Sequence, residues 1–416
     1  IGGGFAGLEA AKVLASQKSV RVALLDRENH HLFQPLLYQV ATAGLNPADI
    51  AAPIRAQFSD SQNIEVHLAH VDSVDLSKKS VWIGGVDFHY DYLLIACGAQ
   101  HSYFGKNQWE DFAPGLKTIE QATEIRRRIL LAFELAENET DPEIQKMLLT
   151  FVVVGGGPTG VELAGAMADI SRTVLVEDFR RINPASARVV LVEAGPRVLA
   201  AFSEALSKKA EQSLRQLGVE VRTNTRVENI DSDGVQIGNE KLLAKNAFWA
   251  AGVQASSLGK KLISEAKSVE LDRAGRVKVN QDLSIPGHPE AFVGGDLASF
   301  EISAGKMVPG LAPAAIQMGH TAAKNILLSI QNKPRQNFHY LDKGQMATIG
   351  KRKAIMQLGK LELSGYIAWL GWLFIHILYL IGFKNRIAVL FQWAWSYTFS
   401  KRGARLIISK EWHSKL

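Results

Sequence analysis

Three glycines at the start of the chain have the spacing of a phosphate-binding turn. They fit the pattern G-x-G-x-x-G and are Gly2, Gly4 and Gly7. The first glycine of this pattern permits a tight turn, the second lets backbone N–H groups approach a pyrophosphate, and the third lets a helix pack close to the sheet. Residues 8–14 continue at helical spacing, and residues 20–26 form a predicted strand that ends in Asp26. A carboxylate there can accept a hydrogen bond from a ribose hydroxyl, so we expect a dinucleotide site.

The same arrangement occurs again 153 residues later. Residues 150–154 are rich in β-branched side chains and lead into three glycines at the same spacing, Gly155, Gly157 and Gly160. A second predicted strand, residues 188–193, ends in Glu193. An acid at this position repels the 2′-phosphate of NADP, so Glu193 favours NAD, although Arg197 is close in the sequence. Two complete patterns imply two bound dinucleotides.

Two bound dinucleotides suggest a redox pair. One of them must stay in place while electrons pass, and a flavin can accept a hydride and hand its electrons on. FAD and NADH are therefore the simplest pair, and this chemistry needs no metal ion. Cys97 is the only cysteine. A single cysteine excludes an intrachain disulfide, a thiol-pair redox centre and a zinc site with two or more cysteine ligands, because each needs at least two cysteines.

These residues require elements that position them. The chain has 416 residues, enough for two to three domains of roughly 150 residues each. A content of 47% hydrophobic and 21% charged residues excludes a disordered or fibrous protein. Each glycine turn lies where a predicted strand passes into a predicted helix. The expected fold class is therefore α/β, with two Rossmann-like domains, each a parallel sheet with helices on both faces.

The C-terminal region differs from the rest of the chain. Residues 346–416 hold 11 Lys and Arg against two acids, a net charge of +9, so the residues before them carry about −3 of the total of +6. Residues 363–383 contain no formal charge and are long enough to cross a bilayer as one helix of about 31 Å. Residues 387–399 give a second apolar helix that is too short to do so. Aromatic residues and cations favour a hairpin in the plane of an anionic membrane surface. A single span, and a buried or dimer-forming helix pair, are the alternatives.

Together the motifs resemble the flavoproteins with two dinucleotide-binding domains. Residues 91–99 resemble the strand that closes the first half of the FAD domain in that superfamily, and residues 290–296 resemble its later flavin motif, which ends in Gly-Asp. The superfamily's thiol enzymes carry cysteines soon after the first ribose acid, but residues 30–45 contain none. Thiol chemistry is therefore excluded.

The remaining segments resemble the type II NADH dehydrogenases, the non-proton-pumping NADH:quinone oxidoreductases. Residues 33–42, 155–165 and 249–253 match their patterns, and residues 311–317, LAPAAIQ, resemble their quinone-site signature A-Q-x-A-x-Q. Pro313 replaces the first glutamine of that signature. The resemblance implies non-covalent FAD, hydride transfer from NADH, and reduction of a membrane quinone by two electrons and two protons. It leaves open whether the quinone is ubiquinone or menaquinone.

The resemblance also implies roles for three side chains. Glu162 would handle a proton near the nicotinamide, the flavin and the quinone, although the helix dipole alone favours an acid in a first turn. Gln317 would hydrogen-bond the quinone or the flavin edge, or else be a solvated or capping residue of a helix over residues 317–328. Lys343 would stabilise the negative charge of the reduced flavin, or be a plain surface lysine.

The implied contacts fall into three groups. FAD would contact Gly2, Gly4, Phe5, Ala6, Gly7, Asp26, Arg27, Pro35, Leu36, Val71, Ala96, Gly98, Asp296 and Ala314. NADH would contact Gly155, Gly157, Pro158, Thr159, Gly160, Glu162, Glu193, Ala251 and Gly252. The quinone would contact Ala312, Pro313, Ala315, Ile316 and Gln317.

The implied domain order places an NADH domain (114–285) inside an FAD domain (1–113 and 286–345), followed by a membrane-anchoring region (346–416). The expected location is the cytoplasmic face of the bacterial inner membrane, with the mitochondrial inner membrane as the alternative. Anionic lipid is an expected partner, nucleic acid is not, and a homodimer is left open. Two other functions stay open: an NADH-dependent reductase of a soluble electron carrier, and a membrane-bound NADH-sensing flavoprotein.

Overall fold

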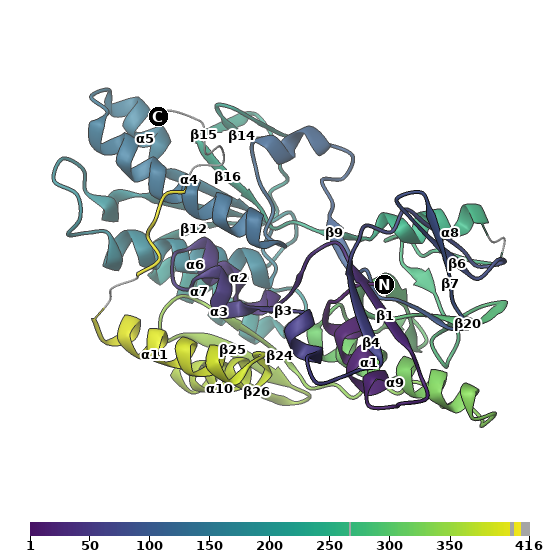
Figure 1. The fold of residues 1–416 in the computed structure, drawn as a ribbon. Coiled ribbons are helices and arrows are strands. Elements are labelled where there is room, and N and C mark those ends of the chain that lie inside the picture. Colours follow the sequence, from purple (N-terminus) through teal and green to yellow (C-terminus); the bar gives the residue numbers. More distant parts are fainter. Residues whose placement is uncertain (266–267, 400–402, 409–416) are drawn as a thin grey trace. The chain divides into compact units, whose positions relative to one another are not determined.

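The computed structural model describes residues 1–265, 268–399 and 403–408 and divides into two compact units (Figure 1). Unit 1 comprises Ile1–Leu32, Ala51–His101 and Val253–Lys343. Unit 2 comprises Phe33–Ile50, Ser102–Gly252 and the described part of Gly344–Leu416. Each unit contains one of the two glycine turns.

The parallel sheet of unit 1 is built around the first two residues of the chain. β1 (Val22–Asp26) pairs in parallel with β4 (Ile64–Leu68), and β8 (Leu93–Ile95) pairs in parallel with β20 (His288–Val293). Gly2 donates its N–H to Leu25 O at 2.7 Å, and Ile1 O accepts the N–H of Ala96 at 2.8 Å. Residues 1–2 therefore lie between β1 and β8 and join the two pairs of strands.

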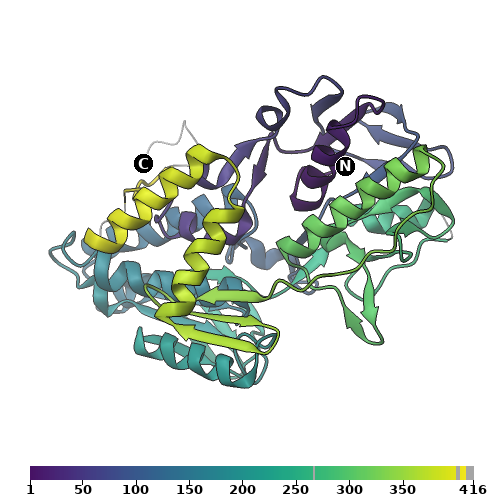
Figure 2. The same ribbon diagram turned by 90° about the horizontal axis from the view of Figure 1, so that it is seen from below.

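Two helices cross this unit side by side (Figures 1 and 2). They are α1 (Phe5–Ala15) and α9 (Ala312–Ile330). A Cβ atom on Gly319 would lie 2.0 Å from Ala6 O, so α9 can approach α1 this closely only because Gly319 has no side chain. The remaining elements of the unit are β2 (His30–Leu32), β3 (Ala51–Pro53), β5 (Ser73–Asp75), β6 (Ser80–Ile83), β7 (Val86–His89), β9 (Ala99–His101), β17 (Val253–Ala255), α8 (Ser257–Glu265), β18 (Val277–Lys278), β19 (Ser284–Ile285), β21 (Ala298–Ser299), β22 (Glu301–Ser303) and β23 (Lys306–Met307).

Unit 2 repeats the strand order of unit 1. Its four parallel strands run in the order β12 (Val219–Arg222), β11 (Arg188–Val192), β10 (Thr150–Val154) and β16 (Asn246–Trp249). Gly155 donates its N–H to Val192 O at 2.8 Å, as Gly2 does to Leu25 O in unit 1. Val154 O accepts the N–H of Ala250 at 2.7 Å, as Ile1 O accepts that of Ala96. The predicted duplication is therefore confirmed in the strand order and in the backbone hydrogen bonds.

The two faces of this second sheet are covered differently. On one face Phe151 contacts Phe133 of α4 (Ile119–Asn138), with ring centroids 5.6 Å apart. On the other face Val152 and Val190 pack with Ile230 and Leu242 in one buried cluster. The latter two belong to an antiparallel sheet of β13 (Asn229–Asp231), β14 (Gly234–Ile237) and β15 (Glu240–Leu243). The expectation of helices on both faces is therefore wrong for this domain. Apart from the C-terminal region, the other α-helices of unit 2 are α2 (Leu37–Ala41), α3 (Pro47–Ile50), α5 (Pro142–Leu148), α6 (Pro158–Asp169) and α7 (Glu204–Gln216).

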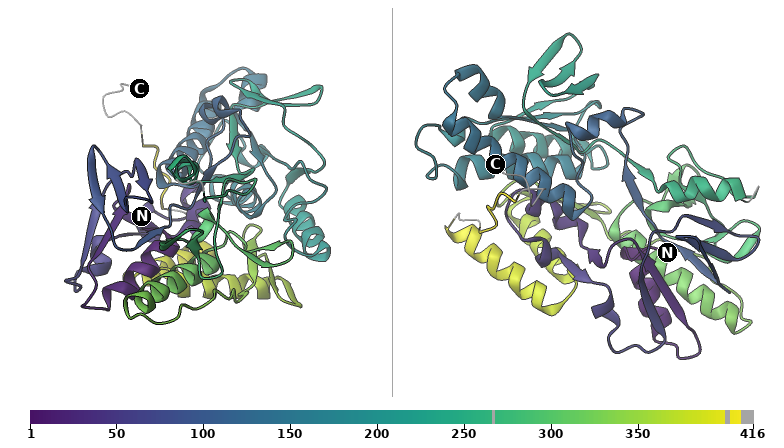
Figure 3. Two further views of the ribbon diagram at one scale, coloured as in Figure 1. Left: turned by 90° about the vertical axis from the view of Figure 1, so that its right-hand side faces the viewer. Right: turned by 45° about the horizontal axis from the view of Figure 1, so that its top comes forward.

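The C-terminal region begins with strands that the sequence did not predict. β24 (Gln345–Thr348), β25 (Ala354–Leu358) and β26 (Leu361–Gly365) form an antiparallel sheet, followed by α10 (Tyr366–Tyr379) and α11 (Phe383–Phe399) (Figure 3). Residues 363–383 are thus not one helix, because Gly365, with a φ of +76°, ends the strand and starts α10. Within the described ranges, no helix has the length and apolar character needed to cross a membrane.

Candidate functional site

The glycine turn of unit 1 owes its shape to close packing. Gly2 has a φ of +96°, and a Cβ atom on it would lie 2.4 Å from Ala96 O. A Cβ atom on Gly7 would lie 1.8 Å from Gly2 O, so α1 requires a glycine there. A Cβ atom on Gly4, in contrast, would meet no atom within 4 Å. The turn is therefore open at its second glycine, where a pyrophosphate would approach the N-terminus of α1.

The glycine turn of unit 2 has the same design. A Cβ atom on Gly155, whose φ is +110°, would lie 2.6 Å from Ala250 O, and one on Gly160 would lie 1.8 Å from Gly155 O. A Cβ atom on Gly157 would meet nothing within 4 Å. Both turns thus fit the phosphates of a dinucleotide in the same way.

Backbone amides hold the acid beside each turn. Asp26 Oδ2 accepts the N–H of Gly3, and its Oδ1 accepts the N–H of Glu28 at 2.7 Å. Glu193 Oε2 accepts the N–H of Gly156 at 2.5 Å, and its Oε1 accepts that of Gly195 at 2.6 Å. Each carboxylate is fixed next to its turn and keeps lone pairs for ribose hydroxyls.

Arg197 does not compete with the preference for NADH. Its guanidinium donates to the carbonyl oxygens of Phe202 and Ala200, at 2.7 and 2.9 Å. Because these bonds to the main chain engage the guanidinium, it is not positioned to pair with a 2′-phosphate.

The later flavin motif lies beside the turn of unit 1. A Cβ atom on Gly295 would lie 3.4 Å from the Cβ of Ala6 and 3.6 Å from that of Ala315, and Ala6, Ala96 and Ala315 form one buried cluster. Asp296 follows Gly295 in a short 3₁₀ helix. The structure therefore brings together predicted FAD residues from three parts of unit 1 and the predicted quinone residue Ala315. The starts of α1 and α9 adjoin this place, which suits an anionic cofactor.

The predicted quinone residues form the first two turns of α9. This helix begins at Ala312 rather than at Gln317, because proline fits the first turn of a helix. Gln317 Nε2 donates to Leu341 O at 3.0 Å and to Pro313 O at 3.1 Å, and Gln317 Oε1 accepts the N–H of Leu341 at 2.9 Å. Both N–H bonds are thus engaged, so a quinone carbonyl, which only accepts, would have to displace one. Lys343 lies two residues after Leu341, the partner of Gln317, and is exposed.

Glu162 lies on α6, just after the glycines of unit 2. Its Oε1 accepts the N–H of Thr348 at 3.3 Å. Burial raises the pKa of Glu162 from 4.5 to about 8, and the hydrogen bond from Thr348 only partly opposes this. The carboxyl group is therefore protonated at pH 7 and can exchange a proton near that pH, as the predicted role requires.

The other predicted residues are found in both units. In unit 1, Arg27 is exposed, with its guanidinium 3.8 Å from the Glu28 carboxylate. Val71 and Ala314 are buried, Ile316 is half-buried, and Gly98 has a φ of +64°. In unit 2, Pro35 and Leu36 belong to a 3₁₀ helix (Gln34–Leu36), Pro158 and Thr159 open α6, and Ala251 and Gly252 follow β16.

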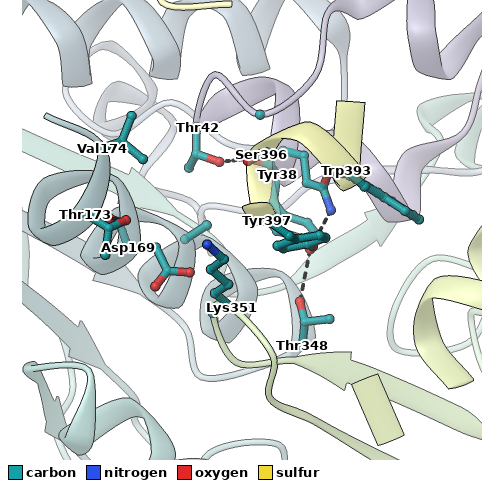
Figure 4. A pocket seen from close by; sticks show the side chains of 14 residues that line it. Tyr38, Thr42, Asp169, Thr173, Val174, Thr348, Lys351, Trp393, Ser396 and Tyr397 are labelled. Carbon is teal, nitrogen blue, oxygen red and sulfur yellow. Dashed lines mark hydrogen bonds between the residues drawn. The ribbon is translucent and has the colours of Figure 1, made fainter. Parts of the chain in front are cut away.

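Two side chains near these sites were given no role in the sequence analysis. His31 is a buried packing residue, with its Nδ1 2.9 Å from Gly3 O. Tyr38 was not singled out, yet its hydroxyl lies 3.0 Å from Thr348 Oγ1 (Figure 4). Tyr38 and Thr348 are 310 positions apart in the sequence, so no local pattern could have predicted this contact.

The class of protein follows from the fold and the two turns. Residues 1–319 match the family of pyridine nucleotide-disulphide oxidoreductases. The structure of NDH2 from Plasmodium falciparum in complex with NADH superposes with a TM-score of 0.87 at 21% identity, covering 98% of each chain. The sulfide:quinone oxidoreductase from Aquifex aeolicus superposes with a TM-score of 0.75 at 20% identity, covering 98% of this chain and 95% of that one. This is the fold of flavoproteins with two dinucleotide-binding domains.

Sequence similarity defines the family within that class. Two type II NADH:quinone oxidoreductases of Mycobacterium tuberculosis, NdhA and Ndh, are each 43% identical to this chain. The matches cover 100% and 99% of this chain and 90% of each relative. The chain therefore belongs to the type II NADH:quinone oxidoreductases. The predicted α/β fold class with two Rossmann-like domains, the cofactors FAD and NADH, and electron transfer from NADH through a flavin to a quinone are confirmed.

Proposed function

We propose that this chain oxidises NADH at the glycine turn of unit 2 and reduces a membrane quinone, with FAD held at the glycine turn of unit 1. The observation that carries this assignment is the duplicated turn, open at Gly4 and at Gly157, with a fixed carboxylate beside each. FAD, when bound, supplies the step between a two-electron hydride donor and the quinone.

The chain's own residues bind, orient and supply a proton. Asp26 and Glu193 accept hydrogen bonds from the riboses, and the helix N-termini after both turns face the pyrophosphates. NADH gives up one hydride, whereas a quinone takes two electrons and two protons to become a quinol, so each turnover uses one proton from water. Glu162, with a pKa of about 8, is protonated at pH 7 and can supply that proton.

The two C-terminal helices are proposed to attach the chain to the membrane. On α10, Ile367 and Phe374 are 67% and 68% exposed, and on α11, Phe391 and Trp395 are 74% and 59% exposed. Their spacing of seven and four residues places each pair on one helix face. Nearby Lys384 and Arg386 suit anionic headgroups. Attachment from the cytoplasmic side of a bacterial inner membrane is part of this proposal.

The function is tested by an anaerobic assay of the full chain purified in detergent. NADH oxidation is followed at 340 nm with and without a short-chain ubiquinone or menaquinone, and with NADPH as the control. We expect a yellow flavoprotein that oxidises NADH rapidly only when quinone is present, and NADPH much more slowly. Flavin that is bleached by NADH but not restored by either quinone would overturn the proposal.

The predicted domain division at residues 113, 285 and 345 and a homodimer are also proposed. Expression of residues 114–285 as a separate chain tests the first, because an independent domain should fold and bind NADH without flavin. Sedimentation in detergent tests the second, because a dimer has twice the protein mass of the 45.6 kDa chain.

A further inference from the structure

Phe104, in unit 2, has a backbone conformation that its side chain disfavours. Its φ is +51°, in the left-handed region that a residue with a Cβ atom occupies only at a cost in free energy. Among the described residues, three other apolar side chains share a positive φ, and all three are buried, so core packing can hold them there: Ala43, Leu199 and Leu283. Phe104, in contrast, is 71% exposed. Core packing therefore does not explain its conformation, and residues held in this way cluster at ligand sites.

The loop before Phe104 is fastened to the end of β16. Ser102 donates its N–H to Gly252 O at 3.3 Å, and Ser102 O accepts the indole N–H of Trp249 at 3.0 Å. The ring of Tyr103 stacks on that of Trp249, with centroids 5.0 Å apart. The main chain that carries Phe104 is thus fixed, and its ring is held in one place.

The ring of Phe104 itself lies against Gly252. A Cβ atom on Gly252, whose φ is +97°, would lie 2.8 Å from Phe104 Cζ, so this approach requires a glycine. The ring also meets that of Trp249 in a T-shaped contact, with centroids 6.0 Å apart and an angle of 64° between the planes. These contacts use only part of the ring. The rest of its apolar surface is open to solvent, which is a second cost in free energy.

The strand order indicates which part of a bound dinucleotide would lie beside this ring. The parallel sheet runs β12, β11, β10, β16, so the ends of β11 and β16 lie on opposite sides of the glycine turn that follows β10. Glu193, directly after β11, is placed for the adenosine ribose, and the turn for the pyrophosphate. The nicotinamide half must therefore extend over the end of β16. Ala251 and Gly252 follow that strand, and a Cβ atom on Gly155 would lie 2.6 Å from Ala251 N, so this segment adjoins the turn directly.

We propose that the ring of Phe104 packs against the nicotinamide half of NADH and contributes to its binding. The inference rests on the proposed function, which places NADH at the glycine turn of unit 2. An aromatic side chain is attracted to a flat or cationic ring, and the oxidised nicotinamide is both flat and positively charged. The contact also covers apolar surface of Phe104 that is otherwise exposed to water. The cost of the left-handed backbone is thereby offset in the complex.

Two ligands that differ in the nicotinamide half test this contact. NAD⁺ does not reduce the oxidised flavoprotein, so its Kd can be measured by calorimetry on the full chain, and ADP serves as the ligand that lacks the nicotinamide half. In Phe104→Ala we expect the Kd for NAD⁺ to rise at least fivefold and the Kd for ADP to stay within twofold of wild type. Phe104→Tyr keeps the ring and should bind NAD⁺ like wild type. Glu193→Gln, on the other side of the turn, should weaken the binding of both ligands.

Thermal unfolding separates this role from a merely structural one. Phe104→Gly should unfold at a higher temperature than Phe104→Ala, because glycine accepts a positive φ, yet both variants should bind NAD⁺ equally weakly. The matched control is Phe112→Ala, at another exposed phenylalanine of unit 2, whose φ is −94°. It should leave both Kd values unchanged.

Wild-type affinity for NAD⁺ in Phe104→Ala, or an equal loss of affinity for NAD⁺ and ADP, would overturn the inference while leaving the proposed function in place. A wild-type chain that binds neither nucleotide would instead overturn the proposed function, and the inference with it.

Discussion

Asp26 and Glu193 occupy equivalent places in two turns, so each serves as a control for the other. In Glu193→Gln we expect kcat/KM for NADH to fall about 10- to 100-fold, because a charge-assisted hydrogen bond contributes roughly 1.5–3 kcal/mol. Discrimination against NADPH should also weaken, since the repelling charge is gone. The flavin content of this variant should be normal. Asp26→Asn should show the reverse, with less bound flavin per chain and unchanged NADH binding; a loss of flavin in Glu193→Gln would contradict the assignment of the two turns.

Glu162 should make the stability of the fold depend on pH. Its pKa is about 8 in the folded chain and near 4.5 when unfolded, so the folded state holds the proton between these values. The stabilisation is fully present below pH 4.5 and is lost as pH rises through 8. Relative to Glu162→Gln, wild type should therefore lose about 4 kcal/mol of stability between pH 5 and pH 9.

Thermal unfolding across that pH range checks this expectation. The exposed Glu362 provides the matched substitution, since Glu362→Gln should follow wild type at every pH. Parallel curves for wild type and Glu162→Gln would show that the carboxyl group is not held protonated.

Single residues also show where sequence reasoning stopped. The glycines and the two ribose acids could be predicted because their chemistry depends on spacing within about 40 residues of chain. The contacts of Gln317 with Leu341 and of Tyr38 with Thr348 depend on segments brought together by tertiary folding, and no local pattern marks them. Gln317 was assigned to the quinone from the motif alone, whereas its amide is bonded to the main chain.

At the scale of elements, the start of α6 allows two glycine substitutions with opposite consequences. Gly160→Ala would put a Cβ 1.8 Å from Gly155 O, so we expect a loss of stability of at least about 3 kcal/mol. Gly157→Ala adds a methyl group that meets no protein atom, so it should fold normally but lose NADH affinity, because the methyl group lies where the pyrophosphate approaches. Chemical unfolding and NADH titration distinguish the two. Equal stability of both variants would argue against the close packing of α6 on its turn.

The exposed faces of α10 and α11 should control membrane binding. Replacing Phe374 and Phe391 by serine removes two large apolar side chains from these faces, and we expect vesicle binding in a flotation assay to fall at least tenfold. Leu243→Ser, at an exposed position of β15 in the same unit, is the control and should float like wild type. Unchanged flotation of the double variant would exclude these faces as the site of attachment.

Helices and strands could be predicted where the apolar residues of a segment follow a single periodicity. The strands and helices beside both glycine turns follow from apolar runs that end in a glycine or an acid. Residues 345–365 gave no such signal, because their three short strands mix apolar and charged residues and turn at Gly359. The apolar run 363–383 predicted too long a helix, since hydrophobicity alone does not show that Gly365 has a positive φ.

At the scale of the whole molecule, charge is distributed unevenly along the chain. The last 71 residues carry +9 and the rest about −3. Binding to vesicles that contain anionic lipid should therefore weaken several-fold between 0.05 and 0.5 M salt, because the Debye length falls from about 14 to about 4 Å. Binding to neutral vesicles should be weaker and nearly independent of salt. Salt independence on anionic vesicles would mean that the apolar faces alone hold the chain.

Main-chain N–H groups of the protein itself tie Asp26 and Glu193 to their glycine turns. Because these bonds fix each carboxylate beside its turn, we expect capture of a nucleotide to require little rearrangement of either turn. Little conformational entropy is then lost on binding, and association is limited mainly by diffusion and orientation. The slow events of the catalytic cycle should accordingly lie in the transfer of electrons and protons or in product release, and not in the docking of NADH.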